Sequence, residues 1–424
     1  MTVATKPLAG TGPWIKAMVD GWARFSEDPE NLTRVFLSPE HKACAEAVMT
    51  AMRAAGMAAR LDAIGNVVGR YEAATPGART LVTGSHIDTV RDAGAYDGNL
   101  GVALPIACIA ELDSRGKRLP YAIEVVAFGD EEGVRFPTTL SGSRTIAGTF
   151  DPAALSVTDA EETSLSDALI HFGCDPSAIA AEARKPEDVL AFVEVHIEQG
   201  PVLESEHLPV GTVTAINGAS RFSVTVTGIA GHAGTVPMGL RKDALAGAAE
   251  MIAAIERRAA AEEGLVATVG RLEAAPGAIN VIPGRVTFTI DIRAPENGQR
   301  EAAVAELKEI LAAIATRRGL EFGIELLYSE GAVACDPTLM DHLDKAIGRQ
   351  GLRALRLPSG AGHDAMALSA LCPIAMLFVR CGGGISHNPL ESITGEDAET
   401  AAQVFLDFLE NLDPDSLGPN NSGR

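Results

Sequence analysis

The stretch Thr80-Leu-Val-Thr-Gly-Ser-His-Ile-Asp88 decides the fold, because a predicted strand, Thr80–Thr83, leads into two ligand-type side chains. A second apolar run, Ala122–Phe128, ends in a similar way, in Gly-Asp-Glu-Glu. Between the two runs, Gly101–Leu112 is predicted to form a helix. Strands that alternate with helices are typical of a mostly parallel sheet covered on both faces. Polar side chains that follow such strands meet at the ligand-binding edge of the sheet.

Further runs extend this sheet in both directions along the chain. Strands are predicted at Asn66–Tyr71, Ala191–Val195 and Ile374–Val379, and a helix is predicted over 41–55. The acidic, Ala-rich segment 151–190 is also predicted to be helical. The expected fold class is therefore α/β, with a mixed-to-parallel sheet and helices on both of its faces.

The pattern changes near residue 211, where half-buried strands begin to alternate with amphipathic helices. Their order, β-α-β-β-α-β, predicts a ferredoxin-like α+β domain that is inserted into the first domain as a lid or dimerisation domain. The expected strands are Arg221–Thr227, Ala267–Leu272 and Val286–Ile292, and the expected helices are Arg241–Glu262 and Arg300–Arg317.

The expected domain boundaries follow from this change of pattern. Residues 1–211 form the first part of the catalytic domain, 212–330 form the insert, and 331–424 form the second part. The polar tail 413–424 is expected to be disordered.

Composition and charge exclude two classes of partner. The 424 residues carry a formal net charge of −21, whereas nucleic acids and anionic membranes bind basic surfaces. Hydrophobic residues make up 46% of the chain, yet no apolar stretch reaches the roughly 20 residues that span a bilayer. The six cysteines are scattered without a Cys-x-x-Cys pair, which favours buried thiols in a reducing compartment. We therefore expect a soluble cytoplasmic protein.

Imidazoles and carboxylates stand out near the ends of the predicted strands. Mixed nitrogen and oxygen ligands suit zinc or a similar divalent ion. One histidine after a strand is more often a capping or core residue, and one acid pair is often a solvated loop. A set spread over the whole chain is harder to explain in that way. Its members are His86, Asp88, Asp97, Glu131, Glu132, His196 and His387.

The spacing within this set indicates different roles. Successive side chains at a strand end point to opposite sides, so one of Glu131 and Glu132 can bind a metal while the other faces water. Asp97 lies in a Gly-bounded loop, where its carboxylate can bridge two ions. Asp88 lies two residues after His86, and we expect its carboxylate to orient the imidazole ring and raise its basicity.

Longer motifs around these residues make the chain similar to a known family. They are Gly84–Val90, Phe128–Phe136, Val195–Leu203, Gly231–Met238, Asn280–Gly284, Asp291–Arg293, Ser359–Asp364 and Gly384–Pro389. The chain resembles the M20 metallopeptidase-type amidohydrolases, in the branch of N-carbamoyl-L-amino-acid hydrolases, β-ureidopropionases and allantoate amidohydrolases. The resemblance covers roughly 35–410, and the His196-Ile-Glu-Gln-Gly-Pro201 segment is specific to this branch.

The resemblance implies two divalent ions in each subunit, with Glu131 as the general base. Zinc is the first candidate, and the same ligands accept manganese, cobalt or nickel. Two ions about 3.5–4 Å apart can activate water at neutral pH and polarise the scissile carbonyl. The residues implied for one ion are His86, Asp97 and His196, and those for the other are Asp97, Glu132 and His387.

The resemblance also implies a polar set that binds substrate. His232 would stabilise the oxyanion, often across a dimer interface, and a helix-capping role is its alternative. Asn280 and Arg293 resemble a grip on a substrate carboxylate, with a solvated strand-end charge as the alternative for Arg293. Gln199 and the backbone at Gly360 would contact the substrate as well. We expect a homodimer that acts on a small molecule.

Three classes of function remain open from the sequence. The first is a hydrolase of the ureido bond in a carboxylate-bearing substrate such as allantoate or an N-carbamoyl-L-amino acid. The second is an N-acyl-amino-acid deacylase or dipeptidase with the same metal centre, and the third is a non-catalytic binding protein. The presence of Glu131 opposes the third class, and the pair Asn280 and Arg293 favours the first. His363-Asp364 has either a structural or a catalytic role.

Overall fold

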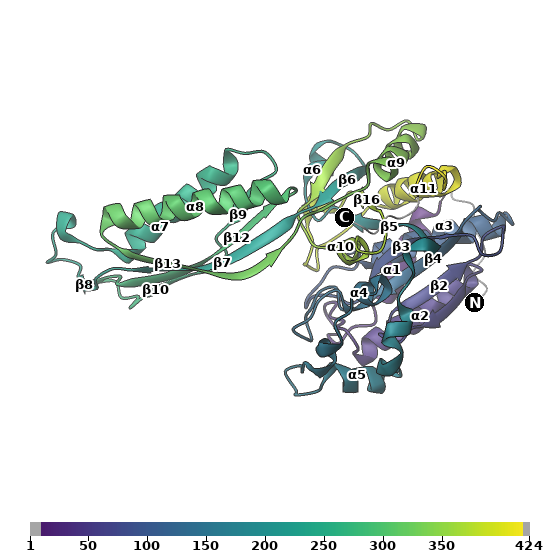
Figure 1. Cartoon of the computed structure of the whole chain (residues 1–424), viewed down its shortest axis with the longest axis horizontal. Coiled ribbons are helices and arrows are strands. Elements are labelled where there is room, and N and C mark those ends of the chain that lie inside the picture. The colour runs from purple at the N-terminus through teal and green to yellow at the C-terminus, as the bar shows by residue number, and fades with distance from the viewer. Residues whose placement is uncertain (1–9, 419–424) are drawn as a thin grey trace. The chain divides into compact units, whose positions relative to one another are not determined.

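A computed structural model describes residues 10–418, which form two compact units (Figure 1). None of the helices in this described range is long and apolar enough to cross a membrane. The first unit contains the residues up to Thr214, 335–357 and the chain from Gly362, and the second contains Ala215–Ala334 and Pro358–Ala361.

The larger sheet has nine strands in the order β1-β2-β4-β3-β5-β16-β6-β14, with β15 also paired to β6. Its central strands β4, β3, β5 and β16 are parallel, and the flanking pairs are antiparallel. The expected mixed-to-parallel sheet is confirmed. The strands are β1 Ala58–Leu61, β2 Val67–Tyr71, β3 Thr80–His86, β4 Ala122–Phe128, β5 Val189–Ile197, β6 Val210–Ile216, β14 Val333–Ala334, β15 Arg356–Ser359 and β16 Ile374–Val379.

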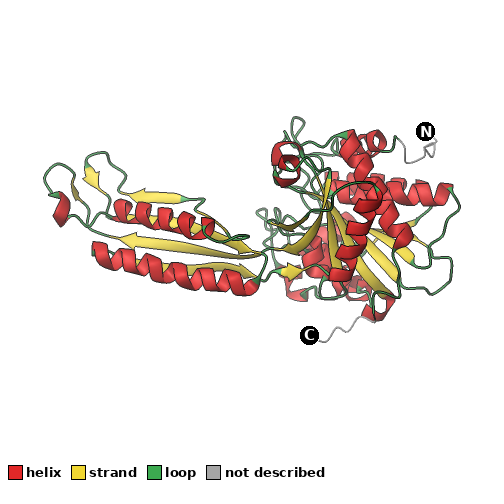
Figure 2. Cartoon of the chain, turned by 90° about the horizontal axis from the view of Figure 1, so that it is seen from above, coloured by secondary structure: helices red, strands yellow, loops and turns green. Residues whose placement is uncertain are grey.

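The central strands are almost continuously apolar because both faces of the sheet are covered. Every residue of β3, β4, β5 and β16 is buried, and Figure 2 shows helices on both sides of these strands. Val125, Val193 and Leu377 pack into the core formed with α1, α2, α3, α9 and α11. Short helix α10 contacts β5 and β16, where its Ala365 N–H donates to Glu194 at 3.0 Å.

Helices and 3-10 turns of the first unit connect these strands. The helices are α1 Gly12–Trp22, α2 Pro39–Ala54, α3 Asn99–Ser114, α4 Ser141–Ala147, α5 Leu165–Phe172, α6 Val202–Ser205, α9 Pro337–Arg349, α10 Asp364–Leu368 and α11 Gly395–Asn411. The 3-10 turns are η1 Pro152–Ser156, η2 Pro176–Glu182, η3 Pro186–Asp188 and η5 Gly382–Gly384.

The second unit has the β-α-β-β-α-β order expected from the sequence. Its antiparallel sheet runs β10-β12-β7-β13, and β9 pairs with β12. Along β12, Phe288 and Ile290 are buried against the core of α7 and α8, whereas Asp291 and Arg293 alternate onto the other face. The elements are β7 Gly218–Thr227, β8 Gly231–His232, η4 Met238–Leu240, α7 Ala244–Ala260, β9 Val266–Thr268, β10 Leu272–Ala275, β11 Val281–Ile282, β12 Arg285–Ala294, α8 Asn297–Arg318 and β13 Glu321–Glu330.

The prediction that 151–190 is helical is wrong for most of the segment. It contains one α-helix, α5, and three 3-10 turns. Asp151 and Asp175 each precede a proline, and their side chains accept hydrogen bonds from backbone N–H groups two residues on. This local bonding favours a turn over a longer helix. Gly173, at φ +100°, ends α5.

Two further predictions need correction. The single strand expected at Ala267–Leu272 is interrupted, because β9 ends at Thr268 and β10 begins at Leu272. The tail is ordered over 413–418, where Arg79 Nη2 donates to the carbonyl of Pro414 at 2.9 Å and Leu417 is buried. The rest of the tail, 419–424, lies outside the described residues.

Candidate metal centre

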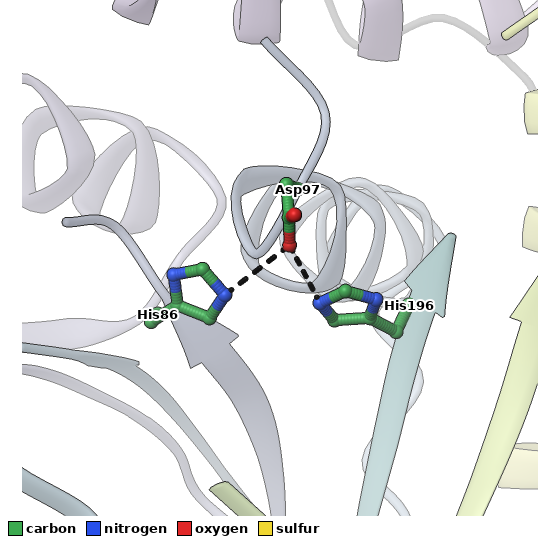
Figure 3. A group of neighbouring side chains, drawn as sticks. All are labelled: His86, Asp97 and His196. Carbon is green, nitrogen blue, oxygen red and sulfur yellow. Dashed lines mark ion pairs between the residues drawn. The ribbon is translucent and has the colours of Figure 1, made fainter. Parts of the chain in front are cut away.

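Three buried side chains from different elements converge in the first unit (Figure 3). His86 is the last residue of β3, His196 lies near the end of β5, and Asp97 lies in the loop before α3. Asp97 Oδ1 is 3.4 Å from His86 Nε2 and 3.1 Å from His196 Nε2. One ligand atom from each of the three residues can therefore surround a single ion.

A second group shares the same aspartate. The other oxygen, Asp97 Oδ2, is 3.3 Å from His387 Nε2, and that nitrogen is 3.7 Å from Glu132 Oε1. The ligand atoms of Asp97, Glu132 and His387 again lie close enough together to hold a metal ion. Asp97 thus faces two sets of ligand atoms with its two oxygens.

Glycine makes the close approach of these loops feasible. At Gly84, where φ is +142°, a Cβ atom would lie 1.9 Å from the carbonyl oxygen of Val126. At Gly98, where φ is +66°, a Cβ atom would lie 2.5 Å from the His86 ring. A side chain at Gly98 would therefore push the Asp97 loop away from the imidazole.

The ionisation of the centre reflects burial together with dense charge. Burial raises the pKa of Glu131 well above its ordinary value, against the charge of His86, and raises that of Glu132 to about 7. Burial alone would lower the pKa of His86, but its hydrogen bond to Asp97 and the nearby charge of Glu131 raise it. Burial opposes ionisation of Asp97, yet hydrogen bonds from His196, His387 and His86 hold its pKa well below the ordinary range.

These properties fit divalent metal ions. The carboxylates of Asp97, Glu131 and Glu132 are packed together, and buried carboxylates of this density need compensating positive charge. Ions bound by the imidazoles and carboxylates would supply that charge in place of protons. In the described part of the chain, the buried Gln199 Oε1 beside this cluster has no hydrogen-bond partner.

The structure corrects the expected role of Asp88. His86 Nδ1 lies 2.9 Å from the backbone carbonyl of Asp88, and it is this carbonyl that orients the ring. The Asp88 carboxylate instead accepts the N–H groups of Glu131 at 3.3 Å and Glu132 at 3.2 Å. Asp88 therefore holds the backbone of the two glutamates. The sequence spacing identified the right neighbour but the wrong acceptor group.

Gln199 and Ser386 extend the surroundings of Asp97. Gln199 Nε2 donates to Asp97 Oδ2 at 2.8 Å, and Ser386 Oγ donates to the same oxygen at 2.7 Å. Ser386 was not predicted, although it directly precedes His387. Glu391 was also missed, and it accepts the N–H groups of Tyr96 and Asp97. The one signal for these residues was their place in the Ser386-His-Asn-Pro-Leu-Glu391 stretch.

His363 and Asp364 belong to the buried packing around His196. The His363 ring meets the His196 ring edge-on at 4.5 Å between centroids. Burial and the charge of His196 lower the pKa of His363 well below its ordinary value. Burial raises the pKa of Asp364, and the charge of Glu194 adds to this. Neither side chain is exposed.

The second unit holds the other predicted residues in two separate groups. His232 and Asn280 flank the β8–β11 pairing, where the Ala233 N–H donates to the Asn280 carbonyl at 2.9 Å. Arg293 lies near the C-terminal end of β12, and its Nη1 donates to the Gly360 carbonyl at 2.7 Å. Arg293 and Gly360 line a cleft of about 590 Å³ on the open face of the sheet.

Asp291 shares the Arg293 site. Arg293 Nε and Nη2 donate to the two Asp291 carboxylate oxygens at 2.9 and 3.0 Å, so one edge of the guanidinium is occupied by an internal carboxylate. This bidentate pairing has the geometry with which arginine binds a carboxylate ligand. No hydrogen bond within the described residues joins Asn280 to Arg293, and their expected joint grip on a substrate carboxylate stays a prediction.

Known proteins of similar sequence include two amidohydrolases. The chain is 41% identical over 413 residues to allantoate deiminase 1 of Glycine max, across 90% of this chain and 85% of that protein. It is 41% identical over 381 residues to N-carbamoyl-L-amino acid amidohydrolase of Geobacillus stearothermophilus, across 90% of this chain and 93% of that protein.

Solved structures and family comparison agree with these relatives. An amidase of the hydantoinase/carbamoylase family from Burkholderia multivorans matches with a TM-score of 0.88 and 34% identity, over 94% of this chain and 97% of that chain. Residues 82–411 match Peptidase family M20/M25/M40. The match and the candidate metal-binding groups support the use of divalent metal ions. This chain belongs to the peptidase family M20/M25/M40.

Proposed function

We propose that this protein is a metal-dependent amidohydrolase that cleaves the ureido (carbamoyl) C–N bond of a small carboxylate-bearing substrate. Allantoate and N-carbamoyl-L-amino acids are the substrates named in its relatives. The observation that carries the proposal is the pair of ligand sets that share Asp97, with the partly buried Glu131 beside them. Two-metal sites can catalyse hydrolysis without an organic cofactor.

The ligand sets would hold two divalent ions. His86, Asp97 and His196 would bind the first, and Asp97, Glu132 and His387 would bind the second. When bound, two such ions supply Lewis acidity, which polarises a carbonyl and lowers the pKa of water. Zinc is our first candidate, and manganese, cobalt and nickel suit the same nitrogen and oxygen donors. Metal analysis of gently purified protein should find up to two equivalents per chain.

Glu131 would act as the general base. During hydrolysis the water oxygen bonds to the ureido carbon, the C–N bond breaks, and Glu131 moves one proton from the water to the leaving nitrogen. Burial favours this role because it raises the pKa of the Glu131 carboxyl group well above its ordinary value. Asp88 would keep Glu131 in place through the backbone N–H that it accepts.

Arg293 would bind the substrate carboxylate, with the Gly360 carbonyl beside it and Gln199 as a further contact. The guanidinium already holds one carboxylate in bidentate fashion, that of Asp291, and keeps donor capacity toward the cleft. Arg221 also pairs with Asp291 at 3.0 Å. Two arginines and one aspartate leave a net positive charge at this cleft, which favours an anionic ligand.

The positions of His232 and Asn280 favour an active homodimer. Arg285 and Arg293 are eight positions apart along β12, a rise of about 27 Å at roughly 3.4 Å per residue. His232 and Asn280 lie beyond the Arg285 end, where Figure 1 places β8, so a small ureido acid cannot reach both groups of one chain. We infer that His232 and Asn280 of one subunit complete the site of its partner, where His232 stabilises the oxyanion and Asn280 joins Arg293 in holding the substrate carboxylate.

An apolar surface beside His232 supports that association. Met238, Leu240 and Ile279 are all exposed in the loops around the β8–β11 pairing. Large exposed apolar side chains gathered in one place mark a surface that another protein covers. A second copy of this chain is the partner that the proposal requires.

We also propose a cytoplasmic location, which the free thiols support. The six cysteines are free, and all except the partly buried Cys174 are buried. Thiols that persist unpaired are typical of a reducing cytoplasm. Titration of the denatured protein, purified without reductant, should find six free thiols, and a lower number would oppose this placement.

A substrate panel tests the function directly. Allantoate, N-carbamoyl-L-amino acids and ureidoglycolate should release ammonia, chelator treatment should abolish the reaction, and added divalent metal should restore it. N-acyl-amino acids and dipeptides form the second arm, because a deacylase or dipeptidase would use the same metal centre. Preferential hydrolysis of that second arm would replace our proposal with the alternative.

A further inference from the structure

Glu391 is a buried carboxylate that lies outside both ligand sets. It is 5% exposed and follows His387 by four residues. Its Oε1 atom accepts two backbone hydrogen bonds from the Asp97 loop, from Tyr96 N at 2.7 Å and from Asp97 N at 3.0 Å. One oxygen of Glu391 therefore holds the backbone of the shared aspartate.

The second oxygen of Glu391 faces Ser386. Ser386 Oγ lies 3.1 Å from Glu391 Oε2 and 2.7 Å from Asp97 Oδ2. A hydroxyl has one proton to donate, so the two carboxylates compete for it, and the shorter distance favours Asp97. Gln199 Nε2 also donates to Ser386 Oγ at 3.2 Å, which leaves the hydroxyl proton free for a carboxylate.

Glycine at position 94 leaves room for the contact between Glu391 and the Asp97 loop. A Cβ atom at Gly94 would lie 2.3 Å from Glu391 side-chain carbons, so a larger residue there would displace the glutamate. Glycine at this position lets the Glu391 carboxyl group reach the Tyr96 and Asp97 N–H groups. The loop that carries Asp97 and the segment 386–391 are thus joined by one side chain.

We propose that Glu391 is a positioning residue of the metal centre, which fixes the Asp97 carboxylate relative to His387 without binding an ion. This inference rests on the proposed metal-dependent function. Asp97 contributes to both ligand sets and His387 to one of them, so a change in their separation alters both sets. Outer hydrogen bonds of this kind commonly change metal affinity by about 10–100-fold when they are removed.

Three substitutions separate hydrogen bonding from charge. Glu391→Ala leaves the two backbone N–H groups without their acceptor and should weaken metal affinity by about 10–100-fold. Glu391→Gln keeps a carbonyl oxygen for both N–H groups and offers an amide N–H to Ser386, so its affinity should stay within about threefold of wild type. Ser386→Ala should weaken affinity in the same direction as Glu391→Ala but by a smaller factor.

The measurement is a competition titration of the full-length protein with a chromophoric chelator, using Zn²⁺ alone as the probe. The thermal midpoint of the metal-free form is recorded for each variant. The matched control is Asp336→Ala, because Asp336 also accepts two backbone N–H groups, Thr338 N at 2.9 Å and Leu339 N at 3.0 Å, at the start of α9. This control should lower the thermal midpoint and keep wild-type metal affinity.

The outcomes distinguish positioning from a merely structural role. Wild-type metal affinity in Glu391→Ala, with or without a lowered thermal midpoint, would overturn the proposal. Equal loss in Glu391→Gln and Glu391→Ala would also overturn it, because charge would then matter more than the accepted hydrogen bonds. If the wild-type protein binds none of the ions Zn²⁺, Mn²⁺, Co²⁺ and Ni²⁺, the proposed function fails together with this inference. If only the variants fail to differ, this inference fails alone.

Discussion

Asp88 holds the backbone of two adjacent glutamates, Glu131 and Glu132, which follow β4 and for which we propose different roles. Asp88 accepts both of their backbone N–H groups, at 3.3 Å for Glu131 and 3.2 Å for Glu132. With the backbone held, both side chains approach the ring of His86, and the ligand atoms of the three residues lie within 4.8 Å of one another. Glu132 Oε1 lies 3.7 Å from His387 Nε2, and in our proposal Glu131 transfers the proton. The backbone positions of both glutamates therefore depend on the Asp88 carboxylate.

Glu131→Gln separates proton transfer from metal binding. The amide keeps the size of the side chain but cannot accept a proton from water, so turnover should fall by about 100-fold or more. Metal content should remain near that of the wild type. The measurement is steady-state ammonia release together with metal analysis of the same preparation. Glu132→Gln is the matched comparison, and it should lose metal, so equal metal loss in both variants would reverse the two roles.

His41 links acid stability to a single buried ring. Burial, aided by the charge of Arg34, lowers the His41 pKa to about 3, and the Leu37 N–H donates to its Nδ1 at 3.1 Å. Between about pH 6.5 and pH 3, His41 binds a proton in the unfolded chain but stays neutral in the folded chain. The free energy of unfolding is therefore highest above about pH 6.5 and falls as pH drops toward 3.

The substitution His41→Gln should flatten that dependence, since an amide oxygen can accept the same N–H without titrating. At pH 4.5 the wild type should have lost about 2–3 kcal/mol through this group relative to pH 7. Urea unfolding of both proteins at several pH values measures the difference, which isolates His41 from other titrating groups. Parallel pH profiles for the two proteins would contradict the assignment.

At the scale of elements, strand β12 carries the residue on which substrate binding should depend. Its alternation buries Phe288 and Ile290 against α7 and α8 and turns Asp291 and Arg293 toward the cleft. A one-residue shift in pairing would exchange these two sets. The strand therefore fixes the guanidinium position as firmly as it fixes the core of the second unit.

Arg293→Ala should raise KM strongly and lower kcat/KM by about 100-fold or more, the scale of a lost charge-assisted pair. Arg293→Lys should recover part of this loss, because a point charge lacks the planar fork. Amidated substrates should be poor for the wild type and little affected by the substitution. The control is Arg271→Ala, since Arg271 also pairs with a carboxylate two residues away, Glu273, on the exposed β10 side. A similar loss in that control would refute the carboxylate grip.

The elements most accurately predicted from sequence are the fully buried strands. Ala122–Phe128 and Ile374–Val379 match β4 and β16 residue for residue, because strands covered on both faces are uninterrupted apolar runs. The prediction of helix over 151–190 failed because Asp-Pro pairs favour short turns that composition alone does not reveal. Secondary structure can thus be predicted from the sequence where a strand is fully buried. It is hard to predict where hydrogen bonds from local side chains determine the backbone conformation.

The candidate site was predictable in its inner part only. Ligand-type side chains such as His86 and Asp97 are recognisable because their chemistry is unusual beside apolar strands. The hydrogen-bond partners of these ligands cannot be recognised in the sequence, because Glu391 and Ser386 reach Asp97 from almost 300 residues further along the chain. The Asp88 carbonyl, which orients His86, leaves no trace in the sequence at all. These partners depend on tertiary geometry.

At the scale of the whole molecule, exchange of subunits tests whether the active site is shared. His232→Ala and Glu131→Gln proteins should each be nearly inactive, but a mixed dimer contains one site with both wild-type contributions. Random reassociation of equal amounts should therefore recover about one quarter of wild-type activity. Activity measured after mixing under mildly dissociating conditions provides the readout.

A second mixture controls for the geometry. His232 and Asn280 lie on opposite sides of one strand pairing, so both come from the same subunit in our proposal. Mixing His232→Ala with Asn280→Ala should therefore recover nothing, because every site receives one defect. Recovery in this control would show that His232 and Asn280 reach a site from different subunits, and a fully active monomer would show that the site is completed within one chain.

The place of β16 in the sheet has a consequence for synthesis on the ribosome. This strand, Ile374–Val379, lies between β5 and β6, yet it is made after the whole second unit. The continuous segment Ala215–Ala334 can fold before β5 and β6 have paired with β16. Until β16 emerges, the apolar edge of β5 is open to wrong pairing. The nascent chain should therefore depend on chaperones most strongly just before β16 is translated.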